Sequence, residues 1–391
     1  MTLARARSLA KDLGISRVTD ITRLDCAGVP VFASIRPDAQ PGSLCVNAGK
    51  GLTIEEARVG ACMEAIEYAF AECNRAALKV SYVPARNVYE GPRRPKSILD
   101  FCPRMNAEID LDGRIACVEA TDIETGEPFL VPGELVFLPF PSTFRGKRYF
   151  GSNSNGLASG NSVLEATVHG LAELIERDIC SFQAIQDGSE LVANRSLPAS
   201  IRNIQKNLAL VGMNLYVRYQ VNTFGIPYFM AVVAEKDSHD PIYISVGYGC
   251  HPLKDIAVTR AVCEAFQSRL SFIHGGRDDL VHRHKRFARL SIKARMKYAG
   301  GLLQRVSRNG TSIHFKDIPD CSRSAINLES SLNVLLDMLK RNGFARVLRL
   351  VYTPAVFPLH VVRILVPGLE CFTETTARVG FRLRDYVRDQ S

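Results

Sequence analysis

NSNGLASGNSVLEATVHGLAELIERDICSF, from Asn153 to Phe182, joins a glycine-rich loop to a long segment with helical periodicity. Five branched aliphatic residues recur at the spacing of one helix face, and little in the segment would break a helix. They are Leu164, Val168, Leu171, Ile175 and Ile179. Gly160 and Asn161 are typical start signals. The stretch therefore predicts a helix that runs to Phe182 and packs its aliphatic stripe against the core.

A polar flank lies beside this stripe. At about 100° per residue, its members fall within a sector of roughly 120°. They are Asn161, Glu165, His169, Glu173 and Glu176. No lysine or arginine occurs between Asn155 and Glu176, so Glu173 and Glu176 should repel each other unless a cation lies nearby. A solvated acidic helix face is the alternative interpretation, because glutamate is a good helix former.

Two further segments repeat the spacing of this flank. EARVGACMEAIE (Glu56–Glu67) matches EATVHGLAELIE (Glu165–Glu176), with glutamate at the first, ninth and twelfth positions. IAVTRAVCEAFQ (Ile256–Gln267) keeps the ninth glutamate and adds an arginine at its fifth position, Arg260. We expect the three helices to bring equivalent flanks to one site, with carboxylates for hard cations and Arg260 for an anion. Carboxylates beside an arginine suggest Mg²⁺ and a polyphosphate.

The same three segments carry a resemblance to a known family. Asn47–Glu67, Ser154–Asp178 and Arg260–Arg269 resemble, in this order, the three ATP-site motifs of the YcaO family, whose members activate backbone amides with ATP. The resemblance spans most of the chain. It departs from the family pattern at Gly60 and Tyr68, where the first motif usually has serine and arginine.

The residue pattern and the resemblance together predict the site residues. The predicted catalytic residues are Arg177, Arg260 and Glu264. The predicted ATP-binding residues are Lys50, Asn161, Glu165, Gln267 and Arg269. The predicted Mg²⁺ ligands are Glu64, Glu67, Glu173 and Glu176. ATP and Mg²⁺ are therefore the expected cofactors.

Lys50 lies in the segment NAGKG, just before a predicted helix from Thr53 to Asn74. Backbone amides at a helix N-terminus favour an anion. The spacing GxxxxGK[ST] of a phosphate-binding loop is missing, so a structural turn and a phosphate cradle both remain open for Lys50.

The element pattern predicts an α+β protein. Helix, glycine and strand recur at Ser200–Val221 and again at Ser330–Tyr352, and Ile242–Val246 is predicted as a strand. The resemblance implies the YcaO-like fold, with mainly antiparallel sheets, helices on their faces, internal repeats and an ATP site between three helices. We predict a single domain over residues 1–391, with a motif-bearing core at about 45–280 and a C-terminal α/β part at about 281–391; two intertwined halves are the alternative.

The composition is that of an ordinary globular protein, with 49 basic and 40 acidic residues among 391 and a net charge of +9. The eleven cysteines show no CxxC pair, and no segment is long and apolar enough to be a signal peptide core or a membrane span. A cytoplasmic protein without a membrane or nucleic-acid partner is predicted. The basic stretch 277–297 is interpreted as a solvated face.

The resemblance also implies the reaction. YcaO enzymes phosphorylate the oxygen of a peptide or protein backbone amide, and the attacking nucleophile determines the product. The C-terminal RVGFRLRDYVRDQS lacks the proline-rich tail common in azoline-forming members, whereas HVVRILVPGLE (His360–Glu370) resembles members that form thioamides with a TfuA partner. We expect a thioamide made from external sulfide with a TfuA-like partner. A homodimer is compatible with this expectation. The alternatives are an azoline-forming cyclodehydratase, a non-catalytic ATP-binding scaffold and a two-metal phosphohydrolase.

Overall fold

The computed structural model describes residues 1–89, 98–236, 240–308, 312–373 and 376–390. The chain forms two compact units, and each unit is assembled from separate stretches of sequence. Unit 1 comprises Met1–Asp38, Leu44–Ala65 and Gly188–Ile326; unit 2 comprises Ala39–Ser43, Ile66–Asp187 and Asn327–Ser391. The single domain over residues 1–391, with its core at about 45–280, stays a prediction.

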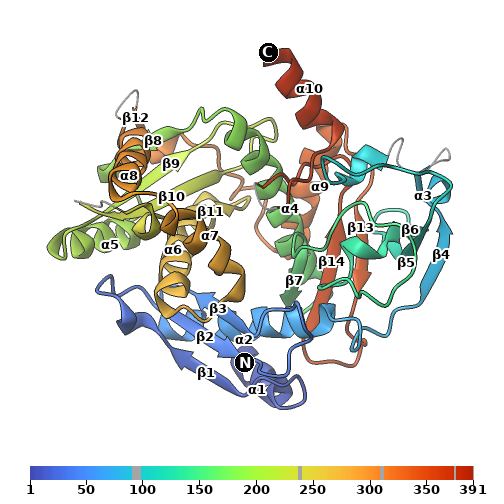
Figure 1. The fold of residues 1–391 in the computed structure, drawn as a ribbon. Coiled ribbons are helices and arrows are strands. Elements are labelled where there is room, and N and C mark those ends of the chain that lie inside the picture. The colour runs from blue at the N-terminus through green and yellow to red at the C-terminus, as the bar shows by residue number, and fades with distance from the viewer. Residues whose placement is uncertain (90–97, 237–239, 309–311, 374–375, 391) are drawn as a thin grey trace. The chain divides into compact units, whose positions relative to one another are not determined.

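Two sheets form the framework of unit 1 (Figure 1). The smaller sheet is antiparallel and consists of β1 (Arg17–Asp20), β2 (Val31–Ile35) and β3 (Val46–Lys50), in this order. The larger sheet has the order β11-β10-β9-β8-β12. Its strands are β8 (Glu190–Val192), β9 (Met213–Tyr219), β10 (Tyr228–Glu235), β11 (Ser245–Cys250) and β12 (Ser312–Ile313). Only the pairing of β12 with β8 is parallel among the described strands of this sheet.

Helices cover both faces of the larger sheet, which explains the unbroken apolar run of β10. Phe229, Ala231 and Val233 belong to the core cluster that contains α6, whereas the alternating Met230 and Val232 belong to the cluster that contains α8. The helices of unit 1 are α1 (Thr2–Ala10), α5 (Ala199–Leu210), α6 (Lys254–His274), α7 (Val281–Ala288) and α8 (Ile292–Ser307). Short 3₁₀ helices lie at Thr22–Leu24, Asn194–Ser196, Pro241–Tyr243, Asp278–Leu280 and Phe315–Asp317.

Unit 2 is built on a mainly antiparallel sheet with the order β4-β5-β13-β14-β7, and β6 pairs with β5 beside this path. Its strands are β4 (Val80–Pro84), β5 (Arg114–Asp122), β6 (Pro128–Pro132), β7 (Leu157–Gly160), β13 (Leu348–Val351) and β14 (His360–Leu365). Its helices are α3 (Arg86–Tyr89), α4 (Val163–Ile185), α9 (Leu328–Arg341) and α10 (Phe381–Gln390), with 3₁₀ helices at Ile98–Phe101 and Gly133–Leu135. The long helix α4 lies against β7 and β14, as Figure 1 shows, and also contacts α9 and α10.

Helix α2 (Ile54–Ala71) begins in unit 1 and ends in unit 2. The predicted α+β class, with antiparallel sheets and helices on their faces, is confirmed. The two helix–glycine–strand repeats are also present, because α5 and α9 each end just before a glycine with positive φ, Gly212 at 72° and Gly343 at 83°.

The strand predicted at Ile242–Val246 is wrong in its position. Pro241–Tyr243 is a 3₁₀ turn, and the strand begins at Ser245. The Asp240 side chain accepts a hydrogen bond from the Ile242 backbone N–H at 3.1 Å and so caps the turn, while Pro241 favours its first position. In the part of the chain that the structure describes, no helix has the length and apolar character needed to cross a membrane.

Candidate nucleotide site

The three predicted flanks belong to three strand–helix pairs of the same design, β3–α2, β7–α4 and β11–α6. In each pair a short strand that contains glycine leads directly into the helix. A Cβ atom on Gly49 of β3 would lie 1.9 Å from the Ala61 backbone nitrogen, and one on Gly249 of β11 would lie 2.1 Å from the Ala257 carbonyl oxygen. Only glycine permits this close approach of strand and helix.

The helices also share one burial pattern. In residues 61–70 and 261–270 the fourth, seventh and eighth positions are half-buried and the others are buried. Residues 170–179 differ only at the seventh position, Glu176, which is buried. The half-buried fourth positions are Glu64, Glu173 and Glu264. Three helices with flanks of such similar accessibility support the position-for-position alignment found in the sequence.

Gly60 and Arg260 occupy the same aligned position. A Cβ atom on Gly60 would lie 3.3 Å from Gly49 Cα and 3.4 Å from the Lys50 backbone nitrogen, so a larger side chain would crowd β3. The departure at Gly60 therefore has a packing reason.

The acids at the start of two of the helices accept hydrogen bonds from the loops before them. Glu56 Oε2 accepts from the backbone N–H groups of Leu52 and Thr53, at 2.8 and 3.1 Å. Glu165 Oε2 accepts from the backbone N–H of Asn161 at 2.9 Å and from its side-chain Nδ2 at 3.1 Å. Asn161 and Glu165, both predicted to bind ATP, are thus held to each other at the N-terminus of α4.

In unit 1 the strand–helix pairs β3–α2 and β11–α6 place their acids in matching positions. Glu64 Oε2 accepts from the Ala48 backbone N–H at 3.0 Å, and Glu264 Oε1 accepts from the Tyr248 N–H at 3.4 Å, each from a residue 16 positions earlier. Lys50 Nζ forms an ion pair with Glu264. The Lys50 ammonium is therefore placed among the predicted site residues and is not confined to a turn.

Gln267 joins this cluster, because its Nε2 donates to the Ala48 carbonyl and lies 3.4 Å from Glu64 Oε2. The pKa of Glu64 is raised because burial disfavours its charged form, although the charges of Arg277 and Lys50 and the Ala48 N–H act in the opposite direction. A carboxyl group in this setting gains stability from a bound cation.

Arg260 projects from the same flank of α6. In the described part of unit 1 its Nε atom is buried without a hydrogen-bond partner. The neighbouring His251 has its pKa lowered to about 4, mainly by burial and further by the Arg260 charge, so His251 is neutral near pH 7 and adds no positive charge. An unsatisfied guanidinium nitrogen beside a neutral imidazole fits an anionic ligand such as a phosphate group.

Arg269, predicted to bind ATP, has a different environment. Its Nε and Nη2 donate to Asp25 at 2.8 and 3.2 Å, Nη2 also lies 3.0 Å from Glu235 Oε1, and Nη1 donates to the Tyr243 carbonyl at 3.0 Å. Its nitrogens are all engaged within the protein. These contacts favour a structural role for Arg269. Its predicted part in ATP binding stays a prediction.

In unit 2 the predicted metal ligands have partners on or near their helices. Glu67 Oε1 accepts a hydrogen bond from the Ser159 hydroxyl of β7 at 2.6 Å. Arg177 lies 4.0 Å from Glu173 and 3.5 Å from Glu176, so one cation beside these acids is the residue that follows them in the helix. The repulsion expected between the two acids is therefore partly compensated.

The described residues contain no group of three or more His, Cys, Asp or Glu side chains that could hold a metal by themselves. This arrangement is compatible with Mg²⁺, which is usually held by one or two carboxylates, water and the phosphates of a nucleotide. The donor set is nearly all carboxylate, as a hard cation prefers. The residues present therefore fit a magnesium–nucleotide complex better than a metal held by protein ligands alone.

Sequence reasoning missed three polar residues near these flanks: His251, Ser159 and Asn47. Asn47 of β3 is fully buried, and neither polar atom of its side chain has a hydrogen-bond partner among the described residues. The available signal was a polar residue within or just after each glycine-containing strand, before the helix that carries the acids.

Comparisons with known proteins identify the family of this chain. The model of the YcaO family, described as YcaO cyclodehydratase, ATP- and Mg²⁺-binding, matches residues 48–370. An uncharacterized protein from Methanothermobacter thermautotrophicus is 32% identical over 382 residues, which cover 96% of this chain and 94% of that protein. An uncharacterized protein in the tfuA 3′ region of Rhizobium leguminosarum bv. trifolii is 32% identical over 381 residues, which cover 94% of this chain and 87% of that protein.

A solved structure supports the fold. YcaO from Methanopyrus kandleri, bound with AMPPCP and Mg²⁺, matches with a TM-score of 0.72 and 24% identity over 97% of this chain and 93% of that chain.

Proposed function

This chain belongs to the YcaO family, and we propose that it uses ATP and Mg²⁺ to activate a backbone amide of a peptide or protein by phosphorylating the amide oxygen. The observation that carries this proposal is the buried, unsatisfied Nε of Arg260 on a helix flank that also holds Glu264. A buried guanidinium nitrogen without an acceptor among the described residues is suited to a phosphate, whereas the carboxylate of Glu264 is suited to a metal ion.

The residues of the two units have separate proposed roles in ATP binding and catalysis. In unit 1, Arg260 binds a phosphate oxygen, Lys50 and Glu264 hold each other in place, and Glu64 and Gln267 form the acceptor and donor next to them. In unit 2, Asn161 and Glu165 order the start of α4. The remaining residues of unit 2 with a proposed part are Glu67, Glu173 and Glu176 as metal ligands and Arg177 as a catalytic cation.

The chemistry follows from the weakness of an amide as an electrophile. Bound ATP supplies a phosphoryl group that turns the amide oxygen into a leaving group. Sulfide adds to the carbonyl carbon, the carbon–oxygen bond breaks, and the oxygen departs within phosphate. The net reaction exchanges one backbone oxygen for sulfur and converts ATP into ADP and phosphate. Arg260 spreads the negative charge that develops during phosphoryl transfer.

A thioamide is the product we propose. One relative of this chain at 32% identity is encoded in the tfuA 3′ region, which supports a TfuA-like partner protein that assists in supplying sulfur. An azoline former is the second candidate, because the family model is described as a cyclodehydratase.

The test uses the purified chain with ATP, magnesium, sulfide, the TfuA-like partner and the candidate substrate polypeptide, followed by mass spectrometry. We expect one oxygen of the substrate to be replaced by sulfur, only when sulfide is supplied. Loss of one water without a requirement for sulfide would identify the azoline former. Absence of ATP turnover under all conditions would leave only the non-catalytic scaffold.

A further inference from the structure

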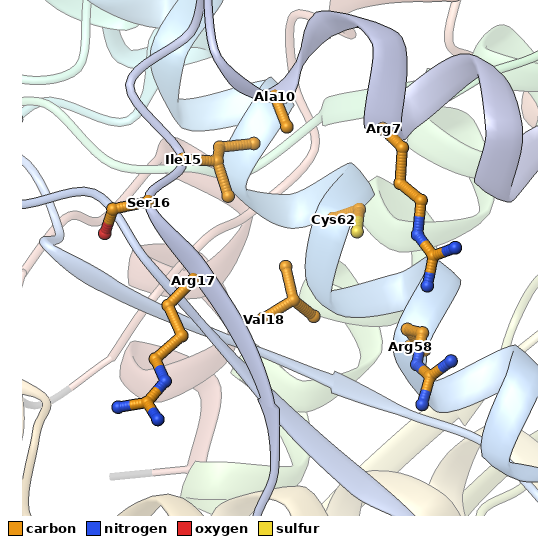
Figure 2. Close-up of a pocket in the computed structure, with 8 residues that line it drawn as sticks. All are labelled: Arg7, Ala10, Ile15, Ser16, Arg17, Val18, Arg58 and Cys62. Atoms are coloured by element: carbon orange, nitrogen blue, oxygen red, sulfur yellow. The ribbon is translucent and has the colours of Figure 1, made fainter.

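A pocket of about 350 Å³ opens in unit 1, away from the residues assigned to the nucleotide. Its lining comes from α1, from β1 and the loop before it, and from α2 (Figure 2). The lining residues are Arg7, Ala10, Ile15, Ser16, Arg17, Val18, Arg58 and Cys62. Arg58 and Cys62 lie one turn apart on α2, whereas Glu64 lies two residues beyond Cys62 and therefore on the opposite side of that helix. We call this cavity the α1–β1 pocket.

The α1–β1 pocket combines an apolar floor with positively charged side chains. Ile15 and Cys62 are buried and Val18 is half-buried. Figure 2 shows the guanidinium groups of Arg7 and Arg58 on the same side of Val18, whereas the Arg17 side chain extends to the other side of the strand.

Arg7 and Arg58 form no hydrogen bond or ion pair with any side chain that the structure describes. Arg58 instead stacks over the Phe32 ring, with its guanidinium carbon 5.0 Å from the ring centroid, so this charge is held in place before a ligand arrives. Two like charges beside one cavity repel each other weakly. An anion bound between them offsets this repulsion. Their charge is complementary to a carboxylate.

The strand that borders the pocket has an open edge. β1 is the terminal strand of its sheet and pairs only with β2 among the described strands. The Ile21 N–H bonds to the Val31 carbonyl, so by alternation residues 17 and 19 face β2 and the backbone groups of Val18 and Asp20 face the open edge. An extended peptide can add to such an edge through main-chain hydrogen bonds, while adjacent pockets select its side chains.

We propose that the α1–β1 pocket binds an extended segment of the peptide or protein substrate that carries an aspartate or glutamate two residues from an apolar residue, so that both side chains face the pocket. The carboxylate pairs with Arg7 and Arg58, the apolar side chain covers Val18 and Cys62, and the segment's backbone runs along β1. The choice of a substrate segment as the ligand rests on the proposed function, which requires a polypeptide substrate. The pocket would select the substrate at a place distinct from the amide that is modified.

The experiment measures peptide binding without nucleotide, so its outcome does not depend on ATP chemistry. The probe is the fluorescein-labelled heptapeptide Thr-Val-Thr-Glu-Thr-Val-Thr, in which each valine is two residues from the glutamate. The control peptide has glutamine in place of the glutamate. We expect fluorescence anisotropy to show about tenfold tighter binding of the glutamate peptide, the difference that a charge-assisted hydrogen-bond pair typically makes.

The variants Arg7→Gln and Arg58→Gln should reduce binding of the glutamate peptide to the level of the glutamine peptide, and Arg58→Lys should restore part of it. Arg17→Gln is the matched control, because Arg17 also lines the pocket but its side chain extends to the other side of β1 from the guanidinium groups of Arg7 and Arg58. Melting temperatures of all variants check that the fold is retained.

Equal binding of the two peptides would overturn the proposal, as would an Arg17→Gln variant that binds as weakly as Arg58→Gln. A further experiment measures whether inorganic phosphate binds to the pocket and competes with the peptides. If phosphate binds in a manner that depends on Arg58 while neither peptide binds, the pocket is a site for small anions and the proposal fails. In either case the proposed ATP-dependent reaction still stands, because it is tested by product formation.

Discussion

Two arginines on one helix illustrate how the surroundings of a residue determine its role. Arg260 and Arg269 both belong to α6. Arg269 is bonded to two carboxylates and a carbonyl, whereas the Nε of Arg260 is buried without a partner in the described part of the chain. The first pattern stabilises the fold and the second favours a ligand.

Replacement of the two arginines should therefore have opposite consequences. Arg260→Ala should lower ATP turnover about 100-fold, since it removes a donor to the phosphate in the transition state, with little change in melting temperature. Arg269→Ala should lower the melting temperature markedly, because it leaves the carboxylate of Asp25 buried and unpaired. Steady-state kinetics and calorimetry on both variants check the contrast. Normal ATP turnover in Arg260→Ala would show that α6 contributes to packing and that Arg260 has no part in phosphoryl transfer.

The acids of α4 are open to a direct binding test. Glu173→Gln or Glu176→Gln should weaken binding of ATP in the presence of magnesium about tenfold, because each removes a charged ligand of the metal. Isothermal titration calorimetry measures this affinity, and a titration without magnesium is the control.

Unchanged affinity in both variants would remove these residues from the nucleotide site. Because Glu173 is partly exposed and lies 4.0 Å from Arg177, Glu173→Gln in the absence of ligand should change the melting temperature only slightly.

At the scale of elements, the fold depends on strands that press directly on helices. Gly247 and Gly249 of β11 approach α6 so closely that an added Cβ atom would lie 2.2 Å from the Ala265 nitrogen or 2.1 Å from the Ala257 carbonyl oxygen. Backbone atoms cannot move aside as a flexible side chain can. The close approach fixes how α6 lies on β11, and with it the direction of Arg260 and Glu264.

Gly249→Ala should accordingly destabilise unit 1 by about 3 kcal/mol or more, through the overpacking that accounts for the largest effects of single substitutions. It should also weaken ATP binding, because α6 must shift. Gly301→Ala is the matched control, since Gly301 lies within α8 and nothing is within 4 Å of its added Cβ. That change should stabilise the protein by about 0.5–1 kcal/mol. Chemical denaturation measures both, and equal effects would contradict the packing argument.

The sequence predicted the helices better than it predicted the short irregular elements. The period of Leu164, Val168 and Leu171 is sufficient to identify α4, because one face of a long helix repeats it several times. The turn at Pro241–Tyr243 depends on a single cap from Asp240, which competes with the β-forming residues that follow it. Local capping of this kind overrides the propensity of a short apolar run.

At the scale of the whole molecule, the recurrence of one spacing in three segments predicted which residues share a flank, because helix geometry is local and repeats. The partners of those residues could not be predicted in the same way. Arg269 finds Asp25 at a separation of 244 residues, and Asp178 finds Arg382 at a separation of 204. No local pattern in a sequence contains such pairs, so a buried structural arginine and a catalytic one look alike before folding.

The C-terminal helix α10 is held to the rest of unit 2 by contacts between residues far apart in the sequence. The Asp178 carboxylate of α4 forms an ion pair with Arg382 and accepts the Glu370 backbone N–H at 2.7 Å. Leu383 is buried, and its N–H donates to Glu370 Oε1 at 2.9 Å. These anchors lie at the start of α10. Arg388 is exposed and pairs only with Asp385 and Asp389 among the residues described.

Removal of the last residues, Arg388 to Ser391, should therefore leave activity and the melting temperature almost unchanged; Ser391 itself lies outside the described residues. We assign this end of the chain no part in the nucleotide site. A strongly inactivating truncation would show that the end of the chain does reach the nucleotide.

Arg382→Ala should behave differently, with a loss that depends on pH. Burial raises the pKa of Asp178 to about 6 despite the opposing charge of Arg382. Because the folded-state pKa exceeds the usual 3.8, the contribution of Asp178 to stability is greatest at low pH and falls as the pH rises towards 6. Without Arg382 the pKa rises further, so this fall extends to higher pH. The variant should match the parent near pH 5 and be less stable by about 2 kcal/mol near pH 8, since a buried carboxylate loses a partly exposed partner. Denaturant unfolding across this range measures the difference, with Arg388→Ala as the control. A difference that is constant with pH would mean that Arg382 acts through packing and not through the charge of Asp178.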